Sequence, residues 1–190
     1  MGTLLIFLIN VVVFWYININ HSDASGLYMQ RYGITYDNYN NPVVWITNAF
    51  IHGGWGHIIM NMMALLEIGF ATEKVTNTFW FFTVYAISLL GADIASVYYV
   101  QENVNVYVIG ASGAIFGLYA FYSLITKEFK DFIIFALIYN GAVYFMDMNI
   151  AWFGHAGGAF AGFIAGMVFL LFNKGFVNDE IQYENGEEEE

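Results

Sequence analysis

The sequence predicts an all-α membrane protein built as a bundle of six transmembrane helices. Its composition is 59% hydrophobic and 11% charged, whereas a soluble globular domain has roughly 45–50% apolar and 25% charged residues. Apolar stretches of membrane-spanning length recur along the chain, with almost no ionisable residue inside them. We expect helices over residues 3–19, 55–72, 78–100, 108–126, 131–147 and 153–173.

The rest of the composition limits the number of domains and the classes of partner. Short polar segments join the apolar stretches, apart from a longer segment over 20–54, so we expect a single domain over residues 1–175. Residues 176–190 form an acidic tail that should be solvated and disordered. The net charge of −11 argues against a nucleic-acid partner, and the absence of cysteine excludes disulfides and thiol chemistry. The lipid bilayer is the expected surrounding.

The basic residues of the chain predict its orientation in the membrane. Cytoplasmic loops of membrane proteins are enriched in Lys and Arg. With six spans, both termini and the segments after the second, fourth and sixth helices lie on one side. All the lysines fall in these segments, and only Arg31 falls in the long loop on the other side. We therefore expect both termini to be cytoplasmic. The lysines are Lys74, Lys127, Lys130 and Lys174.

Three polar residues, one each in the second, fourth and sixth helices, should lie at a similar depth. A helix rises about 1.5 Å per residue, so counting back from a cytoplasmic lysine gives the height of each residue. In a hydrocarbon core about 30 Å thick, the three heights place these residues slightly below the outer surface. Counted this way, Ser112 lies roughly 22 Å above Lys127, His57 roughly 25 Å above Lys74 and His155 roughly 28 Å above Lys174.

The fourth helix begins beside a serine that is surrounded by small residues. Residues 110–117 read Gly-Ala-Ser-Gly-Ala-Ile-Phe-Gly, so another backbone can come close to the hydroxyl of Ser112. Ser112 is therefore a candidate nucleophile. The alternative is a helix N-cap, in which the serine oxygen accepts hydrogen bonds from the free amides of the first turn. Only partners elsewhere in the chain can decide between these two roles.

A histidine at the start of the sixth helix is the candidate base. Glycines recur there at four-residue spacing and give the helix a smooth face for close packing. Gly113 and Gly117 give the fourth helix a matching face, so contact between the two helices would bring Ser112 and His155 together. The alternative is a histidine satisfied by a neighbouring carbonyl or water, but polar residues inside a membrane are usually functional. The glycines are Gly154, Gly158, Gly162 and Gly166.

The second helix carries two polar residues on one face. His57 and Asn61 are four residues apart, so both side chains can direct hydrogen-bond donors to the same point. Negative charge that develops on an attacked carbonyl oxygen needs such donors, and the backbone amide of Ser112 would add another. The alternative is a polar pair that only joins helices by hydrogen bonds.

These three segments together resemble the rhomboid family of intramembrane serine proteases, in its minimal six-helix form. The resemblance covers roughly residues 45–170 and rests on the order, spacing and helix placement of the three motifs. It implies a rhomboid-like bundle with a catalytic dyad of Ser112 and His155. It also implies an oxyanion hole formed by His57, Asn61 and the Ser112 amide. We expect no cofactor and no metal ion.

The resemblance also assigns supporting roles. Phe116, one turn after the serine, would pack against the catalytic histidine, with an ordinary core aromatic as the alternative. Gly110 and Gly113 would keep the backbone beside the serine accessible. The fifth helix and the following loop with Trp152 and Phe153 would move as gate and cap for a substrate that enters sideways between helices.

The sequence departs from the family pattern in two places. Many members carry a Trp-Arg pair in the first outer loop, whereas here Trp45 has no arginine beside it. Tyr36, Tyr39 and Trp45 would instead supply an aromatic belt at the membrane interface. Asp93 lies within the third helix, near the level of the dyad. We expect it to face the outer loops or a water-filled cavity, with tuning of the catalytic histidine as the alternative.

The sequence therefore predicts a serine endopeptidase that cuts a peptide bond in or near a transmembrane segment of another membrane protein. It indicates transmembrane proteins as substrates without indicating which ones, and it predicts no particular oligomeric state. We expect a multi-pass protein of the cell membrane whose active site opens to the extracytoplasmic side. The alternative within the family is a rhomboid-like protein that binds or escorts membrane proteins without cutting them, but such relatives usually lack the serine or the histidine.

Two other classes of protein fit less well. A transporter would show an inverted repeat or charged residues along a central path, and the sequence shows neither. A soluble-type serine hydrolase is disfavoured because Ala114 stands where the G-x-S-x-G turn has its second glycine. That class also needs a strand before the serine, and we expect none.

Overall fold

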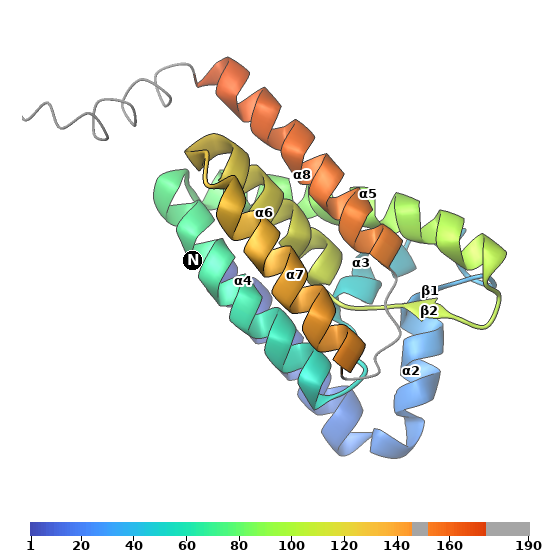
Figure 1. Ribbon diagram of the computed structural model, residues 1–190. Helices are drawn as coiled ribbons and strands as arrows, with labels where there is room; N and C mark the ends of the chain where they lie inside the picture. The colour runs from blue at the N-terminus through green and yellow to red at the C-terminus, as the bar shows by residue number, and fades with distance from the viewer. Residues whose placement is uncertain (146–151, 174–190) are drawn as a thin grey trace, which may run out of the picture.

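The computed structural model describes residues 1–145 and 152–173 (Figure 1). Six long helices form its bundle, so the predicted fold class is confirmed. The segment Trp15–Asn20 continues the first of them as a π-helix. Residues 146 and 147, at the predicted end of the fifth helix, lie outside the described residues. The six helices are α1 (Gly2–Phe14), α4 (Trp55–Val75), α5 (Thr78–Glu102), α6 (Ser112–Thr126), α7 (Phe129–Phe145) and α8 (Trp152–Phe172).

Helix α6 begins at Ser112, whereas the sequence predicts a helix from residue 108. Residues Tyr107–Val108 form the strand β2 instead, and Gly110 has a φ of +105°. Glycine adopts such a φ readily, whereas other residues are strained there, and the value is incompatible with a helix. The irregular segment therefore ends just before the serine, which falls in the first turn of α6.

Three described segments are long and apolar enough to cross a membrane by themselves: Gly2–Asn20, Thr78–Glu102 and Trp152–Phe172. Helix α6 has only 15 residues, or about 22 Å, which is less than a hydrocarbon core of about 30 Å. It lies against α4, α5, α7 and α8, and most of its residues are buried. Because irregular backbone at membrane depth is tolerated where protein covers it, the segment before α6 can enter the bundle.

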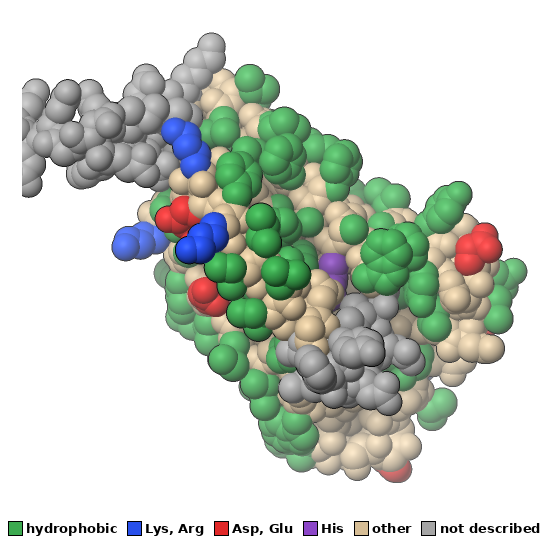
Figure 2. Space-filling model, viewed as in Figure 1, with side chains coloured by type: hydrophobic (Ala, Val, Ile, Leu, Met, Phe, Trp, Pro, Cys, Tyr) green, Lys and Arg blue, Asp and Glu red, His purple; other side chains and the backbone are tan. Residues whose placement is uncertain are grey.

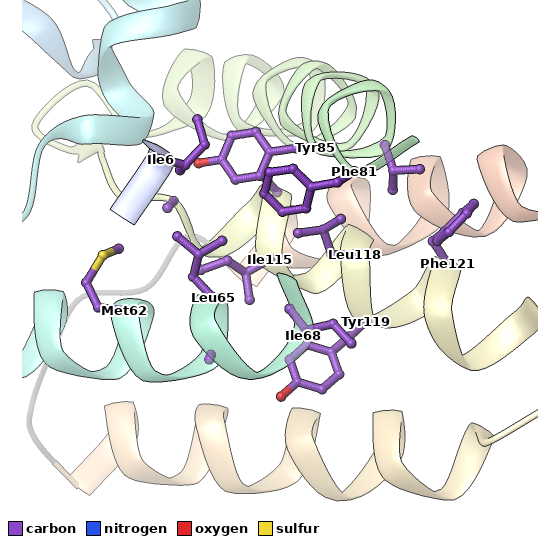
Figure 3. Packing of buried hydrophobic residues seen from close by; sticks show 14 of the residues in the cluster. Ile6, Met62, Leu65, Ile68, Phe81, Tyr85, Ile115, Leu118, Tyr119 and Phe121 are labelled. Atoms are coloured by element: carbon purple, nitrogen blue, oxygen red, sulfur yellow. The ribbon is translucent and has the colours of Figure 1, made fainter. Parts of the chain in front are cut away.

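Large apolar side chains from α1, α4, α5 and α6 fill the main core (Figure 3). Leu65, Phe81, Ile115, Leu118 and Phe121 are among its fully buried members. Lipid tails are as apolar as these side chains, so van der Waals packing rather than transfer out of water stabilises contacts between helices in a membrane. This core holds α6 in a fixed position between its neighbours.

A second kind of packing joins α6 to α8. Gly158 lies against the backbone carbonyl of Gly113, and Gly162 lies against that of Gly117. A Cβ atom at either Gly158 or Gly162 would overlap the facing carbonyl oxygen. The predicted contact between the two glycine faces is therefore present. Both residues of the second pair come four positions after those of the first pair, so α6 and α8 run parallel. Both helices therefore start at the same end of the bundle.

A carboxylate joins three helices at the opposite end of the bundle. Glu73, in the last turn of α4, accepts hydrogen bonds from the backbone amides of Gly2 and Thr3 at 2.9 and 3.0 Å. It also accepts from the hydroxyls of Thr3 and Thr78, at 2.7 and 2.6 Å. Burial raises the pKa of Glu73, but hydrogen bonds from the N-terminal ammonium, Thr78 and Thr3 outweigh burial and hold this pKa well below its usual range.

The arrangement of the helix ends agrees with the predicted topology. Helix α1 starts where α4 ends, and α8 ends beside the end of α6. Lys74 and Lys127 lie at this same end, in the last turn of α4 and directly after α6. Figure 2 shows that the basic side chains visible on one face gather at one end, while hydrophobic side chains cover the middle. Lys174 and the predicted tail, residues 176–190, lie outside the described residues.

The long loop before α4 is structured. It contains α2, α3 and the strand β1, which pairs antiparallel with β2 so that Ile34 lies opposite Val108. The prediction that no strand precedes the serine is therefore wrong, although the strand is only two residues long. The loop also contains two short 3-10 turns. These elements are α2 (Ser25–Tyr32), β1 (Ile34–Thr35), α3 (Val44–Thr47) and the turns Ser22–Ala24 and Asn48–Phe50.

The loop fixes the backbone that leads to the serine. The β1–β2 pairing holds residues 107 and 108, and the amide of Gly110 donates to the carbonyl of Asn48 at 2.8 Å. Irregular segments buried among helices need partners for their backbone groups. The loop supplies these partners, so it positions the start of α6.

Candidate active site

Ser112 is the first residue of α6, and its hydroxyl faces His155. The N-cap of α6 is Ala111, which makes no side-chain cap hydrogen bond, so Ser112 does not play the alternative role of N-cap. Its Oγ lies 2.8 Å from Nε2 of His155, in the first turn of α8. Both side chains are buried, at 7% exposure each. A proton can pass between a hydroxyl and an imidazole at this distance.

Three side chains among the described residues contact the rest of the His155 ring. Phe116 stacks on it with 4.2 Å between ring centroids and 7° between planes. Tyr139 meets it edge to face at 5.4 Å and 83°. The Oδ1 atom of Asn140 lies 3.3 Å from Nδ1, the ring nitrogen that faces away from the serine. Phe116 lies where the resemblance places an aromatic, whereas Tyr139 and Asn140 come from α7 and were not predicted.

His57, in the first turn of α4, presents its Nε2 to Gly110. The amide of Gly53 donates to Nδ1 of His57 at 3.4 Å, so the proton of a neutral ring lies on Nε2. A Cβ atom at Gly110 would come within 2.6 Å of this nitrogen. Glycine is therefore needed at position 110 for space as well as for its φ. The His57 donor points at the backbone directly before Ser112.

Asn61 lies one turn further along α4 and is fully buried. Its Nδ2 donates to the carbonyl oxygen of His57 at 2.9 Å and lies 3.8 Å from the place of a Cβ atom at Gly110. Asn61 is not among the residues that line the adjoining cavity. The structure therefore brings Asn61 close to the same backbone segment as His57, one turn further along α4 and without exposed surface.

The start of α6 adds a backbone donor. The first amides of a helix have no acceptor within the helix and carry a partial positive charge. Ser112 is the first residue of α6, so its amide is one of these groups. The Nε2 of His57 and the Ser112 amide therefore lie beside the same short segment, residues 110–112, where they can act on one oxyanion.

A cavity of about 620 Å³ adjoins these groups, and Ser112, His155, His57, Gly110 and Tyr139 are among its lining residues. Figure 2 shows a histidine side chain that reaches the surface among hydrophobic side chains. At about 30 Å³ per molecule, this volume holds roughly 20 waters or a short stretch of peptide. Ser112 therefore lines a space that is large enough for water or for a short peptide. Within the described residues, no three His, Asp or Glu side chains are grouped to hold a metal ion.

Asp93 lies in the wall of the same cavity, together with Asn48 and Ser96. Its side chain is 2% exposed, and neither its Oδ2 nor the Oγ of Ser96 has a hydrogen-bond partner among the described residues. Nδ1 of His155 faces Asn140 rather than this carboxyl group. Asp93 therefore faces a cavity, as expected, and does not contact the histidine that it was considered to tune.

The sequence matches the family model that describes the rhomboid domain, over residues 40–172. The chain belongs to the rhomboid family. The protein provisionally named rhomboid protease YdcA, from Bacillus subtilis strain 168, is 32% identical over 137 residues, which cover 68% of this chain and 67% of its own length. Two rhomboids of Arabidopsis thaliana are also similar. RHOMBOID-like protein 4 is 31% identical over a stretch that covers 64% of this chain and 32% of its own length. RHOMBOID-like protein 1 is 30% identical over a stretch that covers 67% of this chain and 35% of its own length.

The chain thus spans about a third of the length of these two plant relatives and two thirds of the bacterial one. The matched region contains every residue of the candidate site, from Asn48 to His155. At family level, the comparisons support an intramembrane protease.

The long loop before α4 of this rhomboid is held by aromatic residues. Nε1 of Trp45 donates to the carbonyl of Tyr39 at 2.8 Å, and both side chains pack around Val44 and Val100, the latter near the C-terminal end of α5. Tyr36 remains exposed. Tyr39 and Trp45 therefore fasten the loop to the bundle, which leaves Tyr36 as the residue most available for an aromatic belt.

Trp152 and Phe153 lie in the first turn of α8 rather than in a loop, which corrects the prediction. Their rings stack with 3.8 Å between centroids, and both are exposed. Phe153 also lies 5.6 Å from the ring of Tyr99 in α5. Helix α8 of the rhomboid starts one residue earlier than predicted, and the segment before it, 146–151, lies outside the described residues.

Sequence analysis missed the two residues that α7 adds to the site of this rhomboid. Asn140 carries the only amide side chain in Phe129–Phe145, and a polar residue inside a membrane helix is a functional candidate. That signal could have drawn attention to Asn140. Its partner could not be predicted, because the apolar residues around it surround the helix and do not show which face meets α8.

Proposed function

We propose that this rhomboid is a serine endopeptidase that cuts a peptide bond in or near a transmembrane segment of another membrane protein. The observation that carries the proposal is the 2.8 Å contact between Ser112 Oγ and His155 Nε2 beside a cavity. A serine within hydrogen-bond reach of a histidine is the arrangement that nucleophilic acyl transfer requires. Membership of the family supports the same activity.

In the proposed reaction, Ser112 Oγ attacks the carbonyl carbon of the scissile peptide while its proton passes to Nε2 of His155. The tetrahedral intermediate then breaks the C–N bond, and the same proton passes from Nε2 to the leaving amine. A water molecule, deprotonated by His155, hydrolyses the resulting ester and restores the Ser112 hydroxyl. His155 thus acts first as general base and then as general acid.

The oxyanion of each intermediate would be bound by Nε2–H of His57 and the backbone amide of Ser112. The Gly53 amide supports this role of His57, because it fixes the donor on Nε2. Asn61 would contribute through the second hydrogen of its Nδ2, since the first is bound to the carbonyl of His57. Removal of one such donor typically costs about 10²–10³-fold in kcat.

Substrate would enter from the lipid, between helices. We propose that α7 moves to admit it, together with Trp152 and Phe153 at the start of α8. In support, Phe135 and Tyr139 of α7 meet Phe116 through aromatic rings, at 4.9 and 5.3 Å between centroids. Side-chain contacts of this kind separate more easily than interlocked backbones.

The orientation and extent of the protease are part of the same proposal. Residues 1–175 would form one protease domain in the cell membrane, with both termini cytoplasmic and the active site open to the extracytoplasmic side. The position of Lys74 and Lys127 at the far end of the bundle supports this orientation.

The proposal is tested with purified protein in proteoliposomes and a model transmembrane substrate that has small residues near the middle of its helix. We expect wild type to cut this substrate, and Ser112→Ala and His155→Ala to lose cleavage to a similar extent, because the two residues act as one unit. Ser123→Ala is the matched control, since Ser123 is also buried in α6 but lies near its other end. Cleavage by Ser112→Ala at the wild-type rate would refute the proposal.

A fluorophosphonate probe separates this proposal from the non-catalytic alternative. We expect covalent labelling of wild type and of Ser123→Ala, and none of Ser112→Ala. A protein that binds transmembrane helices without cutting them, and that is not labelled, would instead be a rhomboid-like binding protein.

A further inference from the structure

Helix α7 contributes a side chain to the histidine on the side that faces away from the serine. Oδ1 of Asn140 lies 3.3 Å from Nδ1 of His155, while Nε2 of the same ring lies 2.8 Å from Oγ of Ser112. The imidazole is thus held between an amide and a hydroxyl. The order of groups is Asn140, His155, Ser112, one each from α7, α8 and α6.

The orientation of the Asn140 amide follows from its second contact. Its Nδ2 donates to the carbonyl oxygen of Ala136 at 2.7 Å. The amide hydrogens are therefore directed back along α7, and the oxygen is the atom that faces His155. An amide oxygen can only accept a hydrogen bond, so Nδ1 of His155 must be the donor.

This contact determines where the proton of the ring resides. A neutral imidazole carries one proton. With that proton on Nδ1, the lone pair of Nε2 points at the Ser112 hydroxyl, as a general base requires. With the proton on Nε2, the ring could only donate to the serine and could not accept its proton.

We propose that Asn140 is a positioning residue, which selects the reactive tautomer of His155 and fixes the rotation of its ring. The proposal rests on the proposed function, because a tautomer matters only if His155 acts as a base. Phe116 and Tyr139 cannot select a tautomer, since they contact the ring through aromatic faces and edges. Asn140 is the described side chain that forms a hydrogen bond with Nδ1.

The expected effect is moderate. Reversal of the tautomer by a buried carboxylate-to-amide change costs about 10⁴-fold in a serine protease triad. Removal of Asn140 does not reverse the tautomer but lets both forms be populated, and the half-buried position allows water to replace the amide in part. We therefore expect a loss of about tenfold in kcat, as for the loss of one hydrogen bond between neutral groups.

The kinetic test compares three variants on the same transmembrane substrate. Asn140→Leu keeps the size but removes the acceptor, so kcat should fall about tenfold while KM stays within about twofold. Asn140→Asp keeps an acceptor oxygen and should retain kcat within about threefold of wild type. Asn173→Leu is the matched control, because Asn173 makes the same backward hydrogen bond to a carbonyl, at 2.9 Å, at the other end of α8.

Imidazole nitrogen chemical shifts give a readout that does not depend on turnover. The chain contains four histidines, and the signals of His155 are identified by their loss in His155→Ala. Wild type labelled with ¹⁵N-histidine should show Nδ1 as the protonated nitrogen and Nε2 as the unprotonated one. Asn140→Leu should show a mixture of the two forms, whereas Asn173→Leu should match wild type.

The outcomes separate this proposal from the protease assignment. The role of Asn140 would be overturned if Asn140→Leu kept the wild-type kcat, or if Asn140→Asp lost as much activity as Asn140→Leu. It would also be overturned if the wild-type His155 ring carried its proton on Nε2. Each of these results is possible even if Ser112 is the nucleophile. If wild type neither cuts substrate nor reacts with a fluorophosphonate, the protease assignment fails, whatever the tautomer.

Discussion

The two sides of His155 are built in different ways. On the side of α6, helix α8 touches its neighbour backbone to backbone, with Gly158 against the Gly113 carbonyl. On the side of α7, the same histidine meets the Tyr139 ring in a T-shaped contact and one amide, that of Asn140. Contacts between backbones leave almost no freedom to adjust, whereas contacts between side chains can break and form again.

This difference assigns separate tasks to the two interfaces. The glycine interface fixes the distance between the serine and histidine backbones, because neither helix can approach further or slide without steric overlap. The α7 interface orients the ring within that frame. The proposed protease must admit a transmembrane helix and so needs one wall that moves, and the contrast supports the proposal that α7 is this wall.

The largest loss of activity should come from a methyl group added to the glycine interface between α6 and α8. Gly158→Ala would place Cβ on the Gly113 carbonyl oxygen, so α8 must move away from α6. A displacement of about 1 Å at a catalytic pair can cost 10²-fold, so we expect kcat/KM to fall by about 10² or more. Overpacking of this kind should also lower the free energy of unfolding by about 1–3 kcal/mol.

The matched control for Gly158→Ala is Gly141→Ala, in α7. A Cβ atom at Gly141 would have no heavy atom of the described residues within 4 Å, and alanine favours a helix by about 1 kcal/mol over glycine. We expect Gly141→Ala to cleave substrate at close to the wild-type rate and to be no less stable. Similar losses in both variants would show that the two interfaces tolerate added volume equally, contrary to the comparison.

A second substitution tests the proposed oxyanion donors, which lie beside the backbone at the start of α6. Gly110→Ala would strain a backbone with φ of +105° and bring Cβ within 2.6 Å of Nε2 of His57. Displacement of this donor should lower kcat about 10²-fold. Gly26→Ala is the control, since Gly26 lies in α2 and its Cβ position has no neighbouring heavy atom within 4 Å in the part of the chain that the structure describes. An unchanged kcat in Gly110→Ala would remove His57 from the proposed oxyanion hole.

The same contrast explains which parts of the rhomboid could be predicted from its sequence. Glycines at four-residue spacing predicted the contact of α6 with α8, because a backbone interface needs small residues and therefore leaves a pattern. That contact then brought Ser112 and His155 together. Phe116 was expected only from the family resemblance, and the roles given to these residues in catalysis remain predictions.

The α7 side left no comparable pattern. Apolar residues surround α7, so the sequence does not show which face meets α8, and Asn140 was not connected to His155. The β1–β2 pairing was missed for a related reason, since two-residue strands lie below the length at which alternation of apolar residues can be recognised. Both features depend on tertiary contacts between segments far apart in the chain.

A substitution at Phe116, where α6 meets α7 through side chains, should have a smaller effect. Phe116→Leu removes the ring that stacks on His155 at 4.2 Å but keeps an apolar side chain between α6 and α7. An aromatic pair contributes about 0.5–1.5 kcal/mol beyond its buried area. We expect kcat to fall by up to about tenfold, with thermal stability close to wild type and with fluorophosphonate labelling slowed in proportion. A loss as large as that of Gly158→Ala would mean that the side-chain contact between α6 and α7 is no more adjustable than the glycine interface.

The smallest expected effect on catalysis comes from Glu73, at the far end of the bundle. Its carboxylate accepts hydrogen bonds from the start of α1 and from Thr78, but it lies about 24 Å along α4 from His57. Glu73→Gln should leave kcat/KM of the folded protein unchanged. It should lower the free energy of unfolding by about 1–3 kcal/mol, since hydrogen bonds to a charged group are lost.

The difference in stability between wild type and Glu73→Gln should depend on pH. The folded protein holds the pKa of Glu73 below its usual range, so the carboxylate stabilises the fold above the unfolded pKa of about 4.3. This stabilisation is lost progressively as the pH falls below that value. Thermal unfolding in detergent should therefore separate wild type from Glu73→Gln at pH 7, and the gap should narrow towards pH 3. A gap that stays constant or widens on acidification would show that the charge of Glu73 does not stabilise the junction of α1, α4 and α5.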